Sequence, residues 1–123
     1  MNELGFYLKI WKFTNDPIVV SEALGMEPDS VLRQAADGGR PRQNAWILKS
    51  RPAADGERIE AHWQSLAERI EGRHAAISLL SKTADVVFTL WIPDLQSRPV
   101  LVFAADWVKT MAACNARFEV DYP

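Results

Sequence analysis

The two histidines and the single cysteine carry the most versatile side-chain chemistry in this chain. Neither His62 nor His74 has a Cys, Asp or Glu at a recognised metal-ligand spacing, so we predict no metal site and no cofactor. A nucleophilic cysteine needs a partner base and an electropositive setting, and the residues next to Cys114 supply neither. Because free cysteines are among the most buried residue types, we expect Cys114 to pack in the core. We expect both histidines at the surface or half-buried.

The acidic residues near the end of the chain are the next candidates for chemistry. Glu119 and Asp121 lie on the same side of a predicted strand, and such a pair could perform acid–base catalysis if one carboxyl were buried. Arg117 shares that side, which favours a solvated or interface-facing row of charges. The glycines at 38–39 lack the spacing of a phosphate-binding loop. We therefore predict no catalytic site and no enzymatic activity.

Five cations interleaved with a tryptophan between positions 33 and 51 form the one arrangement that we single out as a candidate binding site. Arginine prefers carboxylates, phosphates and aromatic faces, and Arg and Trp are enriched at interface hot spots. The alternative is a set of ordinary solvated charges around a core tryptophan. Our hypothesis is that this segment binds an acidic partner protein or an anionic ligand. Its residues are Arg33, Arg40, Arg42, Trp46, Lys49 and Arg51.

Length and composition indicate one ordinary globular domain over residues 1–123. A net charge of −2 argues against nucleic-acid binding, which would require clustered basic residues. No apolar run approaches the ~18 residues of a membrane span, and the first residues lack the pattern of a signal peptide. With one cysteine and no internal disulfide, we expect a cytoplasmic protein.

Alternating apolar residues predict strands over 4–13, 45–51, 85–92 and 117–122, with a short further strand at 100–103. Both faces of the 85–92 strand are largely apolar, so this strand is expected near the middle of a sheet. In the first strand, Lys9 and Lys12 indicate that one face is only partly covered.

Helix signals separate these strands. Asp16, Pro17 and Gly25 predict a helix over 17–24. An apolar stripe predicts a helix from residue 57 to about 82, either as one kinked helix or as two short ones, because Gly72 interrupts it.

A further helix is expected over 105–113, with Trp107, Val108 and Met111 on its buried side. Residues 26–44 read as a long loop with a helical turn near Val31. Together the elements predict an α+β fold: a two-layer, ferredoxin-like sandwich. Its sheet would have four to five mainly antiparallel strands, with helices on one face.

Several local strings resemble the bacterial domain of unknown function 4279 family over nearly the whole chain. They include the helix end Leu24-Gly25-Met26, the string Trp46-Ile47-Leu48, the helix carrying Trp63 and the strand at 118–122. The 37–43 stretch departs from the family's shorter, more charged loop. The resemblance implies the same fold and no established activity. By analogy with small bacterial domains, it also implies a role in immunity against toxins.

The leading hypothesis is a non-enzymatic interaction domain of the immunity type that binds an acidic protein. The alternative is a small anionic-ligand-binding or regulatory module with a pocket between sheet and helices, lined by Trp11, Trp46, Trp91 or Trp107. An enzyme of unrecognised type is disfavoured. The exposed final strand also predicts edge-to-edge pairing across a two-fold axis, which would give a homodimer.

Overall fold

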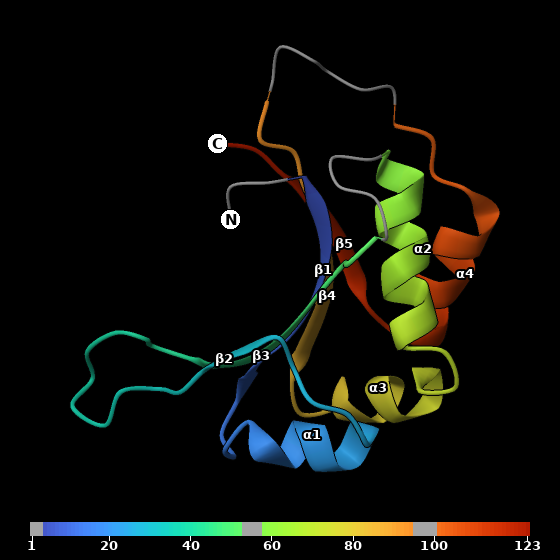
Figure 1. Cartoon of the computed structure of the whole chain (residues 1–123). Coiled ribbons are helices and arrows are strands. Elements are labelled where there is room, and N and C mark those ends of the chain that lie inside the picture. Colours follow the sequence, from blue (N-terminus) through green and yellow to red (C-terminus); the bar gives the residue numbers. More distant parts are fainter. Residues whose placement is uncertain (1–3, 53–57, 95–100) are drawn as a thin grey trace.

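The computed structural model describes residues 4–52, 58–94 and 101–123, which fold around a five-stranded sheet (Figure 1). The strands are β1 (Gly5–Phe13), β2 (Ser30–Leu32), β3 (Asn44–Lys49), β4 (Asp85–Trp91) and β5 (Arg117–Asp121). The helices of these residues are α1 (Ile18–Leu24), α2 (Ile59–Arg69), α3 (His74–Leu80) and α4 (Ala105–Ala113). None of these helices has the length and apolar character that crossing a membrane requires.

The strand order is β2-β3-β1-β4-β5, so the first strand of the chain lies in the centre of the sheet. β1 runs antiparallel to β3 and to β4, and β2 runs antiparallel to β3. β5 alone is parallel to its neighbour, β4, and the connection between them contains α4. The sheet is therefore mixed but mainly antiparallel, which confirms the α+β prediction. The two halves are not equivalent, because β3 separates β1 from β2 whereas β4 and β5 are adjacent.

All four helices pack against the same face of the sheet. Phe6, Leu8 and Ile10 of β1 join one hydrophobic core with residues from α1, α2, α3 and α4. Figure 1 shows α2 and α4 side by side along the sheet, with α3 and α1 below them on the same side. Because side chains alternate along a strand, the residues between these positions point to the other face.

Local sequence signals fix several boundaries of these helices. Asp16 Oδ1 accepts a hydrogen bond from the Ile18 N–H at 3.0 Å, where α1 begins. Gly25 ends that helix with a φ of 65°, as predicted. Gly72, with a φ of 79°, separates α2 from α3, so of the two predicted alternatives the chain forms two short helices and not one kinked helix.

Three details of the sequence prediction are wrong. Val31 lies in β2, where it pairs with Trp46, and not in a helical turn. Residues 101–103 form no strand, and position 100 lies outside the described residues. Val108 is 57% exposed, whereas Trp107 and Met111 on either side are buried as predicted. β2 was missed because three residues are too few to show the alternation of a strand. Val108 was misplaced because it lies at the edge of the apolar stripe of α4.

Candidate functional site

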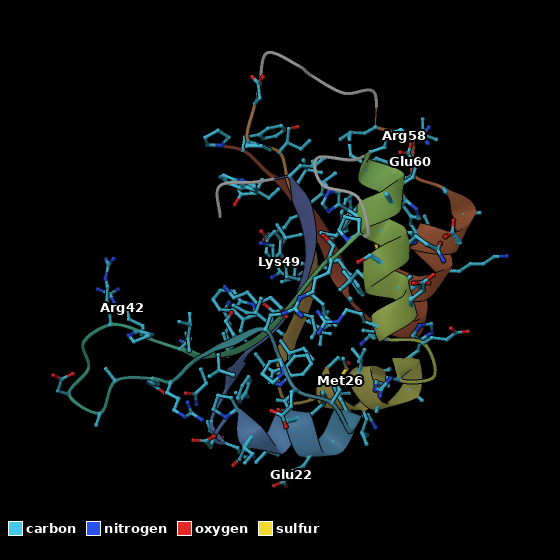
Figure 2. All side chains as sticks on the ribbon, in the orientation of Figure 1. Glu22, Met26, Arg42, Lys49, Arg58 and Glu60 are labelled. Carbon is cyan, nitrogen blue, oxygen red and sulfur yellow. The ribbon has the colours of Figure 1, made fainter. Side chains whose placement is uncertain are left out.

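The six residues of the predicted basic segment do not form one patch. Trp46 is fully buried in the core on the helical side of the sheet. Arg40 and Arg42 are exposed in the loop between β2 and β3, which extends away from the helical layer (Figure 1). Lys49 lies on β3, well apart from Arg42 (Figure 2).

The two remaining arginines of that segment are neutralised by carboxylates. Arg33 Nε lies 3.0 Å from Asp16 Oδ2 on the surface, and this hydrogen bond lowers the pKa of Asp16. Arg51 forms an ion pair with Asp29. Neither arginine is therefore a free cation for an anionic ligand.

Asp29 is the centre of a structural junction that no local sequence pattern indicates. Its carboxylate accepts hydrogen bonds from the Lys49 N–H at 2.6 Å and from Arg69 Nη1 at 2.5 Å. Arg69 also donates to the Lys49 carbonyl at 2.8 Å. Burial alone would raise the pKa of Asp29, but these hydrogen bonds and the charges of Arg69 and Arg51 lower it overall. The junction joins the segment before β2 to β3 and α2.

His62 is buried, with 7% of its surface exposed, so the prediction of a surface or half-buried position is wrong. Its Nδ1 lies 2.8 Å from Ser50 Oγ, and that oxygen accepts the Phe6 N–H at 3.0 Å. A serine beside a histidine has the spacing of a nucleophile and its base. Ser50 is itself buried, so a substrate has no access to the pair. The Ser50–His62 contact links β1, the end of β3 and α2. The other histidine, His74, is half-buried as expected.

Cys114 is fully buried, which confirms its predicted place in the core, and burial raises the pKa of its thiol to about 12. At pH 8 roughly one thiol in ten thousand would be ionised, against about a quarter for a free cysteine. We expect Ellman's reagent to label folded protein more than about a hundred times more slowly than urea-unfolded protein. Rapid labelling of the native protein, measured at 412 nm as released chromophore, would contradict this burial.

The four tryptophans named as possible lining of a pocket between sheet and helices do not share one side of the sheet. Trp46 and Trp107 are core residues, whereas Trp11 and Trp91 lie on the opposite face of the sheet. No group of three or more potential metal ligands occurs among the described residues. We therefore look for the candidate site on the surface of the protein.

The described residues line two surface clefts that bear on the choice of site. One, of about 450 Å³, lies beside the loop between β2 and β3. Three of its polar side chains are already engaged, because Asn44 Nδ2 donates to the Phe13 and Asn15 carbonyls, and Arg33 pairs with Asp16. The other, of about 350 Å³, is apolar and lies between α4 and β5.

The face of the sheet opposite the helices is the better candidate site, and we call it the open face. No described helix packs on it. In the register of the strands, Lys9 lies between Ile47 and Val87. Tyr7 lies between Lys49 and Thr89. Thr89 Oγ1 in turn donates to Glu119 Oε1 at 3.2 Å. By this register the open face includes Tyr7, Lys9, Trp11, Ile47, Lys49, Asp85, Val87, Thr89, Trp91, Arg117, Glu119 and Asp121.

The centre of the open face is buried even though no described helix covers it. Tyr7, Val87 and Thr89 are nearly inaccessible to solvent, because longer side chains surround them. Lys9 Nζ lies 4.0 Å from the ring centroid of Trp11, and Lys12 Nζ lies 4.5 Å from it. These cation–π contacts hold two positive charges over the aromatic surface.

The indole N–H groups of Trp11 and Trp91 are shielded from solvent and have no hydrogen-bond acceptor within the described part of the chain. A buried donor without an acceptor costs about 1–3 kcal/mol. Most buried polar groups are paired, so such donors call for an explanation. Both donors belong to the open face, where a bound molecule could supply acceptors.

A family model described as Domain of unknown function (DUF4279) matches residues 2–123. No curated protein and no solved structure matches the chain. The comparisons thus agree with the family resemblance noted in the sequence and assign no residue a role.

Proposed function

The chain belongs to the DUF4279 family, and we propose from its geometry that it is a non-enzymatic interaction domain that binds an acidic partner protein through the open face. A role of the immunity type is one form of this proposal, in which the partner is a toxin. The buried Ser50–His62 pair and the protonated Cys114 thiol support a binding function rather than catalysis.

The observation that carries the proposal is the pair of unpartnered indole donors. Both donors are shielded in the free protein, so a partner would have to displace the side chains over them. Its carbonyl or carboxylate oxygens would then remove the cost of leaving Trp11 Nε1 and Trp91 Nε1 unpaired. Tryptophan also contributes large apolar contact area and is enriched at the energetic centres of protein interfaces.

Positive charge on the open face gathers over β1 and β3, and this part of the face favours an acidic partner, whereas Asp85, Glu119 and Asp121 lie on β4 and β5. Lys9 and Lys49 belong to β1 and β3, while Lys12 of β1 is paired with Asp85, with Nζ 3.8 Å from Oδ2. Arg40 and Arg42 are exposed on the loop that extends away from the helices, and neither forms an ion pair with a described residue (Figure 2). Opposite charges across an interface raise association rates and exclude wrong partners. Part of the predicted basic segment thus remains in the proposal.

The proposal also includes a fold type and a cellular location. The ferredoxin-like description of the sandwich is supported by the helix-containing connections that return the chain to the sheet. A cytoplasmic location is supported by a single cysteine that is buried as a thiol.

The test uses the five indole N–H signals of the protein in a ¹⁵N–¹H NMR spectrum, titrated with a glutamate-rich peptide as probe. We expect the signals of Trp11 and Trp91 to shift, because new acceptors approach them. The three core tryptophans serve as internal controls whose signals should stay in place. A lysine-rich peptide of equal length should produce no shift.

Charge reversal gives the matched comparison for this titration. Lys9→Glu should weaken peptide binding about tenfold or more, since it removes a cation beside Trp11 and repels the probe. Lys109→Glu, an exposed reversal on α4, should leave binding unchanged. The proposal is wrong if the two variants bind alike, or if the shifts map to the cleft beside the loop between β2 and β3.

A further inference from the structure

β5 is the outermost strand of the sheet, and its outer edge carries unused backbone groups. Within the described residues, β5 hydrogen-bonds along its length with β4 alone. Such an edge is a template for another strand unless charge, a bulge or a covering segment blocks it. β5 is five residues long and has no proline, so the described part of the edge remains competent to pair.

The apolar cleft of about 350 Å³ runs beside this edge, between α4 and β5. Phe103 and Val108 on its rim are 49% and 57% exposed. Phe118 of β5 contributes to the floor and packs edge-on against Phe103, with ring centroids 5.3 Å apart. The edge and the apolar cleft therefore form one continuous surface.

The sequence of β5 is self-complementary in one antiparallel register. With Phe118 opposite Phe118 of a second copy, Arg117 lies opposite Glu119, and Ala116 lies opposite Val120. Residues 116, 118 and 120 then face apolar side chains, and the Arg117–Glu119 pair occurs twice, once on each side of the two-fold axis. Arg117 also binds Asp85 at 2.9 Å, but its guanidinium has further donors for a second carboxylate.

We propose that this surface binds a second copy of the chain, so that two β5 strands pair antiparallel across a two-fold axis and the two α4 helices meet over them. A specific interface buries about 800 Å² on each partner, more than the edge of a five-residue strand supplies. The apolar cleft provides the additional area, because a perpendicular two-fold axis brings both helical layers to the same side of the joined sheet. Apart from the β5 residues at its edge, the open face stays free in this arrangement, so the dimer does not depend on the proposed partner.

The oligomeric state tests this surface directly. We expect the protein to sediment as a dimer that dissociates on dilution in analytical ultracentrifugation. Glu119→Arg should raise the dimer dissociation constant about tenfold or more, because two arginines then face each other twice. Val108→Arg should have a similar effect, since it places a charge in the cleft at a position that is exposed in the monomer.

A charge exchange identifies the register. The double variant with Arg117→Glu and Glu119→Arg restores opposite charges in this register and should recover much of the dimer lost in Glu119→Arg. In a register shifted so that Glu119 faced Glu119, the same exchange would weaken pairing further. Glu22→Arg, an exposed reversal on α1 at the far end of the molecule (Figure 2), is the control and should leave the dimer intact.

Circular dichroism confirms that each variant is folded before its sedimentation is interpreted. A wild-type protein that stays monomeric at millimolar concentration would overturn the proposal. A dimer that neither Glu119→Arg nor Val108→Arg weakens would overturn it as well.

Discussion

Replacing Trp63 with alanine should reduce the free energy of unfolding by about 3–5 kcal/mol. Single domains are commonly stable by about 5–15 kcal/mol, so this variant would be partly unfolded at 37 °C or would express poorly. The physical reason is the loss of three aromatic contacts in the core, together with the cavity that remains.

Trp63 of α2 is only 2% exposed and stands at the centre of this aromatic group. Its ring centroid lies 5.3 Å from that of Phe6, 5.5 Å from that of Trp107 and 5.8 Å from that of Phe88. Its Nε1 donates to Asp106 Oδ2 at 3.1 Å. The side chain therefore joins α2 to β1, β4 and α4 at one point.

Urea unfolding followed by circular dichroism measures the effect. Trp63→Phe keeps much of the packing but leaves Asp106 without this donor, so its loss should be smaller, about 1–2 kcal/mol. Trp91→Phe, on the open face, should change stability little and serves as the matched tryptophan control. A Trp63→Ala protein as stable as wild type would contradict the assigned core.

Replacing Asp29 with asparagine should reduce stability at pH 7 by about 2 kcal/mol. The carboxylate is 11% exposed and accepts hydrogen bonds from Arg69 and from the Lys49 N–H, with Arg51 as a second ion-pair partner. Asparagine keeps the size of the side chain but removes the charge, which leaves Arg69 partly buried without its counter-ion. Arg69 then keeps only weaker, neutral acceptors.

The difference between wild type and Asp29→Asn should depend on pH in a defined direction. The folded-state pKa of Asp29 is lowered below its ordinary value of 3.8, so the carboxylate stabilises the folded state fully above that value. As the pH falls through the lowered pKa, the folded state loses this contribution. Unfolding measured from pH 7 to pH 3 should therefore show the two proteins converging on the acid side.

Asp16→Asn is the control for this prediction. Asp16 also pairs with an arginine and also has a lowered pKa, but both partners are exposed. Solvent weakens such surface ion pairs, so its replacement should change stability less than that of Asp29. Equal losses in the two variants would show that burial of the Asp29 junction does not matter.

The parts of the fold that the sequence predicted are those with a local signal. The alternation in β1 and β4, the apolar stripe of α2 and the bounds of α4 all depend on residues close together in the chain. Gly25 and Asn115 were also readable, because each takes the positive φ that ends a helix. The sequence prediction missed β2 because this segment has no strand pattern of its own. It is a strand because it pairs with Trp46 and the neighbouring residues of β3.

The site was less predictable, for a related reason. Lys9 and Lys12 did indicate a face of the sheet that is only partly covered. The pairing of β1 with β4 brings Trp11 and Trp91 to the same face, where their indole N–H groups are shielded. This pairing cannot be read from residues close together in the chain. The Asp29 junction joins residues up to 40 positions apart, and charges alone gave no sign of it. Sequence proximity grouped Trp46 with its basic neighbours, whereas burial separates them.

The central position of β1 also has a consequence for how the chain is made. Its pairs with β4, from Trp11–Asp85 to Gly5–Trp91, join residues 74 to 86 positions apart. During synthesis β1 can pair with β3 first, but its other edge stays open until β4 has left the ribosome. An apolar strand edge is thus exposed for much of translation, when nascent chains are prone to aggregate or to bind chaperones. The many long-range pairs also favour slow folding for a protein of this size.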